Sequence, residues 1–219
     1  MLDLRSYLLN DIKPLQLQET VQEALATMEE LDFKELPVEE AGEYLGLVGE
    51  NTLYEADDPD GSLLDLKQFL KTVFVSPEAH LFEAIRLCSE HQIALLPVVE
   101  QQQYKGYLSL TDLAQDMGSK ISFRDPGGLL ELHMTLQDYS HVQIAQIVES
   151  EDAKITALLT YAISDNEIGV VLKINQKDLS RIIQAFKRYN YEVGQVYHET
   201  LFDDSGERSL DSLISYLKV

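Results

Sequence analysis

The apolar residues of the N-terminal half follow a helical period twice. Two sets recur at the three- and four-residue spacing of one helical face, first Val21, Leu25, Met28 and Leu31, then Leu81, Ile85 and Cys88. Each set is preceded by an extended lead-in, at 15–17 and 74–75, and followed by two short apolar runs around a polar turn. The pattern therefore predicts lead-in, helix, strand, strand and helix, twice over.

The two sets of elements are copies of each other. A shift of sixty residues places "ELPVEEAGEYLGLVGENTL" (35–53) on "LLPVVEQQQYKGYLSLTDL" (95–113), with identities at Leu36, Pro37, Val38, Glu40, Tyr44, Gly46 and Leu53. Two copies of this length favour two related units rather than a solenoid. Because neither unit can cover both faces of its small sheet, each must pack on another copy. Pro37 and Pro97 are expected at strand starts, where no ladder N–H is needed.

A different order of elements follows the breaker cluster "RDPGG" (124–128). "LLELHMTL" alternates like a strand, and Ser140 precedes Gln143 in capping-box spacing. Two further strands, "ITALLTYAI" and "IGVVLKIN", flank a turn at 164–167, and an amphipathic helix precedes the strand "EVGQVYHE". Strand, helix, strand, strand, helix, strand is the ferredoxin-like βαββαβ order. The expected fold class is therefore mixed α/β (α+β).

Charge and composition limit the function classes. Seventeen basic and 38 acidic residues give a net charge of −21, which repels nucleic acid and anionic membranes. No apolar run of transmembrane length occurs, and the first residues do not resemble a signal peptide. The single cysteine, Cys88, agrees with a reducing compartment, so a cytoplasmic protein is expected.

Residues that would carry catalysis are not arranged for it. The five histidines are scattered, and the sequence contains no Walker loop, dinucleotide fingerprint or nucleophile elbow. Cys88 lies on an apolar helical stripe and is expected in the core. The acidic stretch "ADDPDGS" (56–62) lacks the closing glutamate of a calcium loop and is taken as a linker. We expect no enzyme, no metal and no cofactor.

The stretch "LPVVEQQQYKGYLSLTDL" resembles the signature of the CBS domain, and the first copy resembles it more weakly. Residues 1–125 are thus similar to a CBS-domain pair, with repeat units at about 1–60 and 61–120. The resemblance implies a regulatory sensor, often of adenosine-containing ligands, and not an enzyme. It also implies a ligand site in the second unit, formed by Ser109, Thr111, Asp112, Pro97, Val98 and Ser76.

The spacing of Ser109 and Asp112 has two explanations. A hydroxyl three residues before a carboxylate caps many helices, whereas a carboxylate at a helix start can also accept the hydroxyls of a ribose. The matching positions of the first unit are Gly49 and Thr52, and Lys34 is the basic residue near its Leu-Pro pair. We therefore expect adenosine or a monophosphate, in the second unit only. The alternative is a structural interaction protein with degenerate pockets.

Residues 126–200 resemble an ACT domain through their order of elements. This resemblance implies a module that dimerises and often binds amino acids through the loop after its first strand. Here that loop, "LQDYSH" (136–141), contains no glycine, and its candidate ligand residues are Asp138 and Ser140. The alternative is a domain that only joins protomers, sheet edge to sheet edge. The whole chain is similar to regulatory proteins of the acetoin-utilisation type, and a homodimer is expected.

The remaining residues, 201–219, form a tail. Its last part places Leu210, Leu213, Ile214 and Leu217 on one face of a short amphipathic helix. Such a helix is too short to be stable alone and must dock on its own protein or on a partner.

Overall fold

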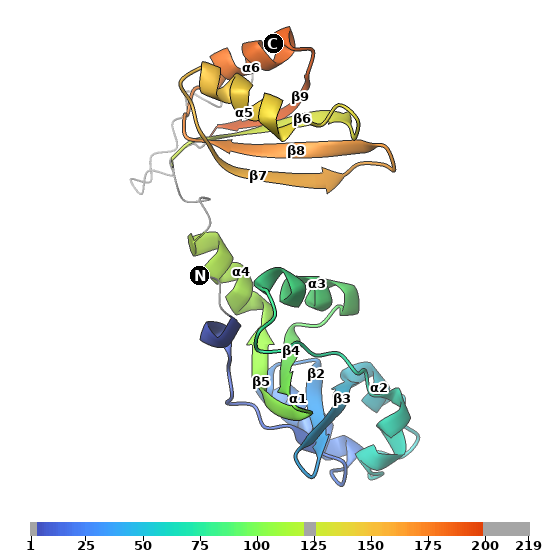
Figure 1. The fold of residues 1–219 in the computed structure, drawn as a ribbon. Helices are drawn as coiled ribbons and strands as arrows, with labels where there is room; N and C mark the ends of the chain where they lie inside the picture. Colours follow the sequence, from blue (N-terminus) through green and yellow to red (C-terminus); the bar gives the residue numbers. More distant parts are fainter. Residues whose placement is uncertain (1–3, 121–125, 199–219) are drawn as a thin grey trace, which may run out of the picture. The chain divides into compact units, whose positions relative to one another are not determined.

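The computed structural model describes residues 4–120 and 126–198, which belong to two compact units, Met1–Gly118 and Ser119–Val219 (Figure 1). The tail helix proposed at 210–217 lies outside the described residues. The elements of the N-terminal unit are η1 (Leu4–Tyr7), β1 (Leu15–Gln16), α1 (Val21–Leu31), β2 (Glu35–Glu40), β3 (Glu43–Gly49), α2 (Glu50–Tyr54), η2 (Leu63–Phe69), α3 (Leu81–His91), β4 (Leu95–Glu100), β5 (Gln103–Ser109) and α4 (Leu110–Lys120). The order predicted for both repeats is confirmed.

The two repeats share one hydrophobic core. Leu36 and Val48 of the first repeat belong to the same buried cluster as their counterparts Leu96 and Leu108 of the second. Cys88 lies in this cluster, and burial raises the pKa of its thiol to about 11. A buried thiol with a raised pKa is a poor nucleophile, so the prediction of a core cysteine is confirmed.

The lead-in to each repeat, residues 9–17 before the first and 71–75 before the second, pairs with a strand of the other repeat. Leu9, upstream of the first repeat, exchanges two backbone hydrogen bonds with Tyr107 of β5, at 2.9 and 2.8 Å. Lys71, upstream of the second repeat, exchanges two with Leu47 of β3, both at 2.9 Å. The lead-ins then run parallel to the first strand of their own hairpin, with Leu15 beside Val38 and Val75 beside Val98. The lead-ins therefore join the repeats through backbone pairing as well as through the core.

This exchange explains the glycine that both repeats retain. Gly106 has a φ of +140°, and a Cβ built on it would lie 2.1 Å from the carbonyl oxygen of Leu9. A Cβ on its counterpart Gly46 would lie 3.0 Å from the carbonyl oxygen of Lys71. Glycine is needed where another backbone passes this closely, and the requirement is stricter in the second repeat.

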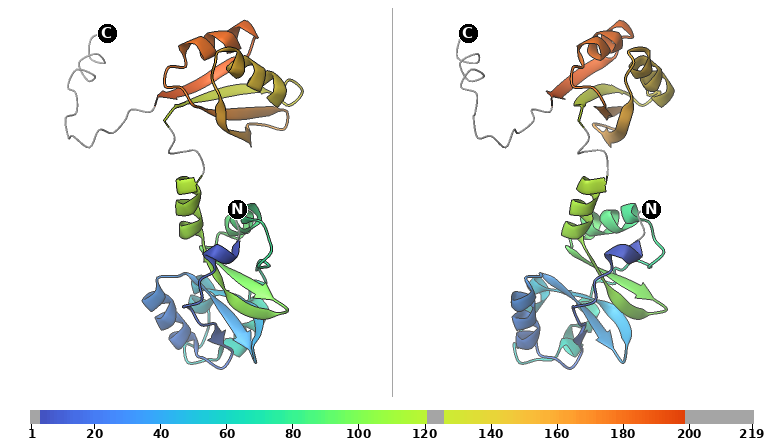
Figure 2. Two further views of the ribbon diagram at one scale, coloured as in Figure 1. Left: turned by 60° about the vertical axis from the view of Figure 1, so that its left-hand side comes forward. Right: turned by 90° about the vertical axis from the view of Figure 1, so that its left-hand side faces the viewer.

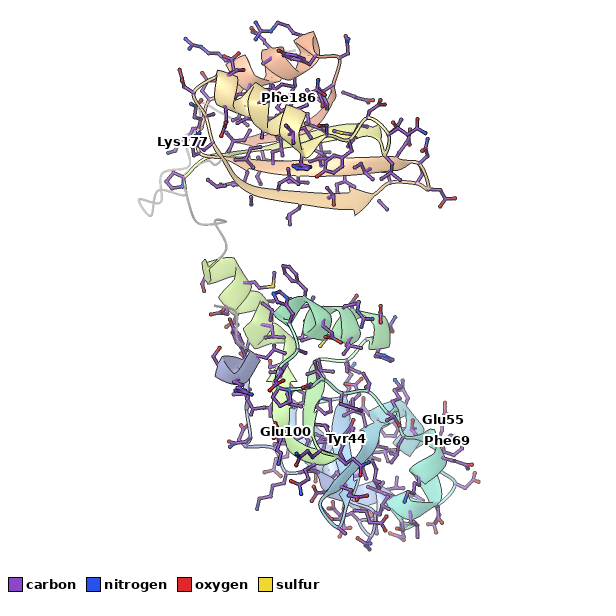
Figure 3. All side chains as sticks on the ribbon, in the orientation of Figure 1. Tyr44, Glu55, Phe69, Glu100, Lys177 and Phe186 are labelled. Carbon is purple, nitrogen blue, oxygen red and sulfur yellow. The ribbon has the colours of Figure 1, made fainter. Side chains whose placement is uncertain are left out.

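The retained tyrosine has a matching explanation. The Tyr44 hydroxyl donates to the carbonyl oxygen of Val73 at 2.7 Å, and the Tyr104 hydroxyl donates to that of Ile12 at 3.4 Å. Both acceptors lie in the lead-in segments, so each tyrosine holds a lead-in against its hairpin. Burial raises the pKa of both phenols, which therefore stay protonated donors at any physiological pH. Tyr44 is labelled in Figure 3.

The prolines do not start their strands, which corrects the prediction. Pro37 and Pro97 are the third residues of β2 and β4. The carbonyl oxygen of Pro97 accepts from the Val75 amide at 2.9 Å, so the nitrogen of Pro97 faces the same side, toward the lead-in. The lead-in pairs with β4 only from Val75 onward. The proline nitrogen therefore lies beyond the end of that short pairing, and no ladder bond is lost.

The C-terminal unit is a two-layer α/β fold. Its elements are β6 (Gly128–Thr135), α5 (His141–Ser150), β7 (Ile155–Ala162), β8 (Glu167–Ile174), α6 (Ser180–Arg188) and β9 (Glu192–His198). The strands lie in the antiparallel order β7-β8-β6-β9, which is the ferredoxin-like arrangement predicted from the sequence. Figures 1 and 2 show α5 and α6 on one face of this sheet. Phe186 of α6, labelled in Figure 3, is fully buried between the two layers.

Candidate functional site

The candidate site lies where β5 ends and α4 begins. Ser109 is the last residue of β5 and pairs with Leu95 of β4. The amide of Asp112 donates to the Ser109 hydroxyl at 3.3 Å, so the capping geometry expected from the spacing is formed. Capping uses the backbone amide of Asp112, and its side-chain carboxylate is exposed. Among the described residues, this carboxylate accepts no hydrogen bond and forms no ion pair. Thr111, beside it, is exposed as well.

The other predicted residues divide into two groups. Pro97 and Val98 are buried in β4, opposite Tyr107 and Gly106, and Val98 belongs to the shared core. Ser76 is exposed, and its hydroxyl accepts from the Glu78 amide at 3.3 Å. Since the lead-in runs parallel to β4 with Val75 beside Val98, Ser76 lies beyond this bridge, away from the Ser109 end. Ser109, Thr111 and Asp112 thus lie together at the start of α4, whereas Ser76 lies just after the lead-in, and its part in the site stays a prediction.

Two residues near the site were not found by sequence reasoning. The Tyr107 hydroxyl donates to Asp11 Oδ1 at 3.1 Å, and the Tyr107 ring contacts Phe33 edge to face, with centroids 5.8 Å apart. Burial, the hydrogen bond to Asp11 and the nearby charges of Asp11 and Asp112 raise the pKa of Tyr107 to about 12. Asp11 comes from the lead-in, 96 residues away in sequence, and no local pattern connects it with Tyr107. Tyr107 itself is visible in the motif but aligns with Leu47, so the repeat comparison concealed it.

The equivalent place in the first repeat carries other chemistry. Gly49 precedes α2 and supplies no side-chain cap, and the helix is only five residues long. The Glu50 amide donates to the Lys34 carbonyl oxygen at 2.8 Å, as the Leu110 amide does to Ala94 at 2.9 Å. The backbone frames therefore correspond, whereas Gly49 and Thr52 offer no carboxylate for a sugar.

A cavity with a volume of about 650 Å³ lies at one end of the C-terminal sheet. Its lining includes the predicted Asp138 together with Thr135, Gln143, Glu167 and Glu192, and none of its lining residues is lysine or arginine. Asp138 Oδ2 accepts from the Thr135 hydroxyl at 2.7 Å, which fixes the carboxylate in the loop. Ser140 instead caps α5, accepting from the Gln143 amide at 3.3 Å, as the capping-box spacing predicts. Asp138 therefore faces the cavity, and Ser140 serves the helix.

Within residues 4–120 and 126–198, no helix is both long and apolar enough to cross a membrane. In the same ranges, no group of three or more His, Cys, Asp or Glu side chains is placed to hold a metal ion.

Known proteins resemble this chain over about half of its length. The profile of the CBS domain family matches residues 67–118. The CBS domain-containing protein YhcV of Bacillus subtilis is 31% identical over 109 residues, which are 48% of this chain and 77% of that protein. A solved CBS domain pair/ACT domain protein from Thermotoga maritima is 29% identical, with a TM-score of 0.49, over 53% of this chain and 97% of that one. The acetoin utilization protein AcuB from Vibrio cholerae is 23% identical, with a TM-score of 0.47, over 57% of this chain and 96% of that one.

Proposed function

We propose, from the premise that this chain belongs to the CBS-domain family, that its second repeat binds an adenosine-type ligand and transmits the occupancy of the site to a partner. Proteins of this family are typically regulatory and generally non-catalytic. The observation that carries the proposal is the Asp112 carboxylate, exposed and without a hydrogen-bond partner among the described residues, at the start of α4 beside Ser109. A carboxylate in such a place accepts the two hydroxyls of a ribose.

The charge around Asp112 limits the ligand. Asp11 and Asp112 both lie close enough to Tyr107 to raise its pKa. With these carboxylates and a net charge of −21, a triphosphate would meet strong repulsion. Adenosine or its monophosphate is therefore the ligand class that the site favours.

Replacing Asp112 by alanine should abolish the rise in melting temperature that AMP causes in the unaltered chain. A ligand bound only to the folded protein stabilises it by about 2.7 kcal/mol at a hundred times its Kd, and this stabilisation requires the ribose contact. Differential scanning fluorimetry measures the rise. Asp112→Asn keeps the shape of the side chain and should lower the rise as well. Asp57→Ala removes an exposed carboxylate from the linker and should leave it intact; an equal rise in Asp112→Ala would refute the site.

The C-terminal cavity supports a second candidate function, recognition of an amino acid through its ammonium group. Asp138, Glu167 and Glu192 line the cavity, and Tyr189 and Tyr191 add aromatic surface, which suits a cationic group. Because three carboxylates and neither lysine nor arginine line the cavity, a basic amino acid fits better than an acidic one.

Lysine should accordingly raise the melting temperature more than glutamate does, because its two ammonium groups meet the carboxylates of the cavity. Asp138→Asn should remove most of that difference, whereas Asp152→Asn, on an exposed turn after α5, should not. The same fluorimetry measures both variants. Equal responses to lysine and glutamate in the unaltered chain would exclude this candidate.

The C-terminal unit also supports a homodimer formed through β7. This strand is an edge of the sheet, and its eight residues, "ITALLTYA", contain neither a charge nor a proline. The opposite edge, β9, is different, since it carries Glu192 and a register irregularity near Gly194. Proteins protect edge strands with charges and bulges, so an unprotected edge indicates a partner strand. A second copy of β7 supplies one by antiparallel pairing.

A further inference from the structure

The sheet of the C-terminal unit has one face that no described helix of this unit covers. Figures 1 and 2 show α5 and α6 together on the opposite face. Along β6, Leu130 and Leu132 are fully buried under these helices, so the residues that alternate with them point to the open face. The strand register extends this face to the other strands, and its apolar residues include Leu129, Leu159, Tyr161, Val171 and Tyr197.

The open face exposes large apolar side chains. Leu159, Tyr161 and Tyr197 are 52%, 42% and 56% exposed. The Tyr161 ring lies across β8, since a Cβ built on Gly169 would fall 2.2 Å from it. The hydroxyl of Tyr161 donates to the Glu131 carboxylate, which therefore has a partner on the same face. A contiguous apolar patch of this kind marks an interaction site.

A hollow of about 480 Å³ lies in this face. Tyr161 of one edge strand and Tyr197 of the other line it, and Leu129 and Val171 of the central strands lie between them. The hollow also contains polar groups, from Glu131, His133 and Gln195. An apolar stripe flanked by polar residues, as on an amphipathic helix, matches this lining.

The chain itself offers an occupant in its tail. Residues 199–219 follow β9 directly, and Tyr197 near the end of β9 lines the hollow. The connection, 199–209, reaches about 36 Å when extended, whereas the four strands span about 14 Å. The apolar stripe of the tail can therefore reach every part of the face, and its tether raises its effective concentration to about millimolar. The residues of this stripe are Leu210, Leu213, Ile214 and Leu217.

We propose that segment 210–217 docks as a helix on the open face, with its apolar stripe in the hollow between Tyr161 and Tyr197. The sheet is then covered on both faces, by α5 and α6 on one and by the tail on the other. Docking gives the stripe the apolar contacts that a short helix needs to be stable. The edge of β7 stays available for pairing with another strand. The inference does not rest on ligand binding by either unit.

Tryptophan fluorescence tests the docking in the full chain, because the chain itself contains no tryptophan. Leu213→Trp places an indole on the apolar stripe, and its emission maximum should be shifted clearly to the blue of tryptophan in water. Ser215→Trp places the indole about 150° around the helix from the stripe and should emit like tryptophan in water.

Substitutions of the open face show where the stripe docks. In the Leu213→Trp chain, Tyr197→Lys should return the emission to that of Ser215→Trp, because a charge at the hollow opposes apolar docking. Tyr189→Lys alters a tyrosine of similar exposure, 55%, at the end of α6, and should leave the emission unchanged. Leu159→Ser removes an exposed leucine from the open face and should shift the emission in the same direction as Tyr197→Lys. Circular dichroism checks the fold of each variant.

Three results would overturn the inference. Equal emission maxima of Leu213→Trp and Ser215→Trp would show that the stripe is not docked. An unchanged emission in Tyr197→Lys or, if that variant does not fold, in Leu159→Ser would place the stripe on another surface. An emission maximum that shifts to the red on dilution would place it on a second copy of the chain.

Discussion

Replacing Gly106 by alanine is expected to lower the free energy of unfolding of the N-terminal unit by about 3–5 kcal/mol, the sum of a strained φ and an overpacked contact. The new Cβ would lie 2.1 Å from the carbonyl oxygen of Leu9, and backbone at +140° disfavours any side chain. Relief requires the N-terminal segment to move away, which breaks both hydrogen bonds between Leu9 and Tyr107. Urea denaturation followed by circular dichroism measures the loss.

Two other glycines serve as controls for this substitution. Gly46→Ala should lower the free energy of unfolding by less, because the atoms nearest to its Cβ are 3.0 Å away and need to move only slightly. Gly118→Ala, in α4 with no neighbour within 4 Å of its Cβ, should stabilise the protein by up to about 1 kcal/mol. A Gly106→Ala variant as stable as the unaltered chain would show that the N-terminal segment does not pair with β5.

Replacing Thr160 by lysine is expected to convert the proposed homodimer to monomer. Thr160 is exposed on β7, and antiparallel pairing of two copies around a twofold axis would bring two lysines into one interface. Lysine on an edge strand is the device by which proteins prevent such pairing. We expect the dissociation constant to rise at least tenfold, equivalent to ~1.4 kcal/mol. Sedimentation velocity across a concentration series measures it.

The matched control introduces the same charge on the other edge. Gln195→Lys lies on β9, where Glu192 and the irregular register already oppose pairing, and should leave the dimer intact. A monomeric unaltered chain at micromolar concentration, or a Thr160→Lys variant that still dimerises, would exclude β7 as the interface.

Local patterns were sufficient to predict most of the fold. The apolar spacing of α1 and α3, the alternation in β6 and the cap at Ser140 are all decided by neighbours within a few residues, and each is observed. The sixty-residue repeat also predicted a tertiary contact, because two units that cannot each cover their own sheet have to share a core. The order of elements in the C-terminal half likewise predicted its strand order.

Contacts between distant segments could not be predicted in this way. Nothing near Leu9 or Lys71 indicates that each pairs with a strand far from it, and nothing near Arg5 indicates its ion pair with Glu78. The prolines were misplaced for a related reason, since the side of β4 that needs no N–H depends on where the lead-in begins to pair. Within the site, Ser109, Thr111 and Asp112 are neighbours in the motif and in the structure, whereas the part of Ser76 depends on contacts between distant segments and stays a prediction.

The proposed function depends on a difference between the two repeats, since the second has the Asp112 carboxylate where the first has Thr52. Isothermal titration of the unaltered chain with AMP tests this directly, because it counts the sites. The account predicts one AMP bound per chain. Two bound per chain would show that Gly49 and Thr52 suffice for a site, and none would show that the second repeat, despite its free carboxylate, is only a structural copy.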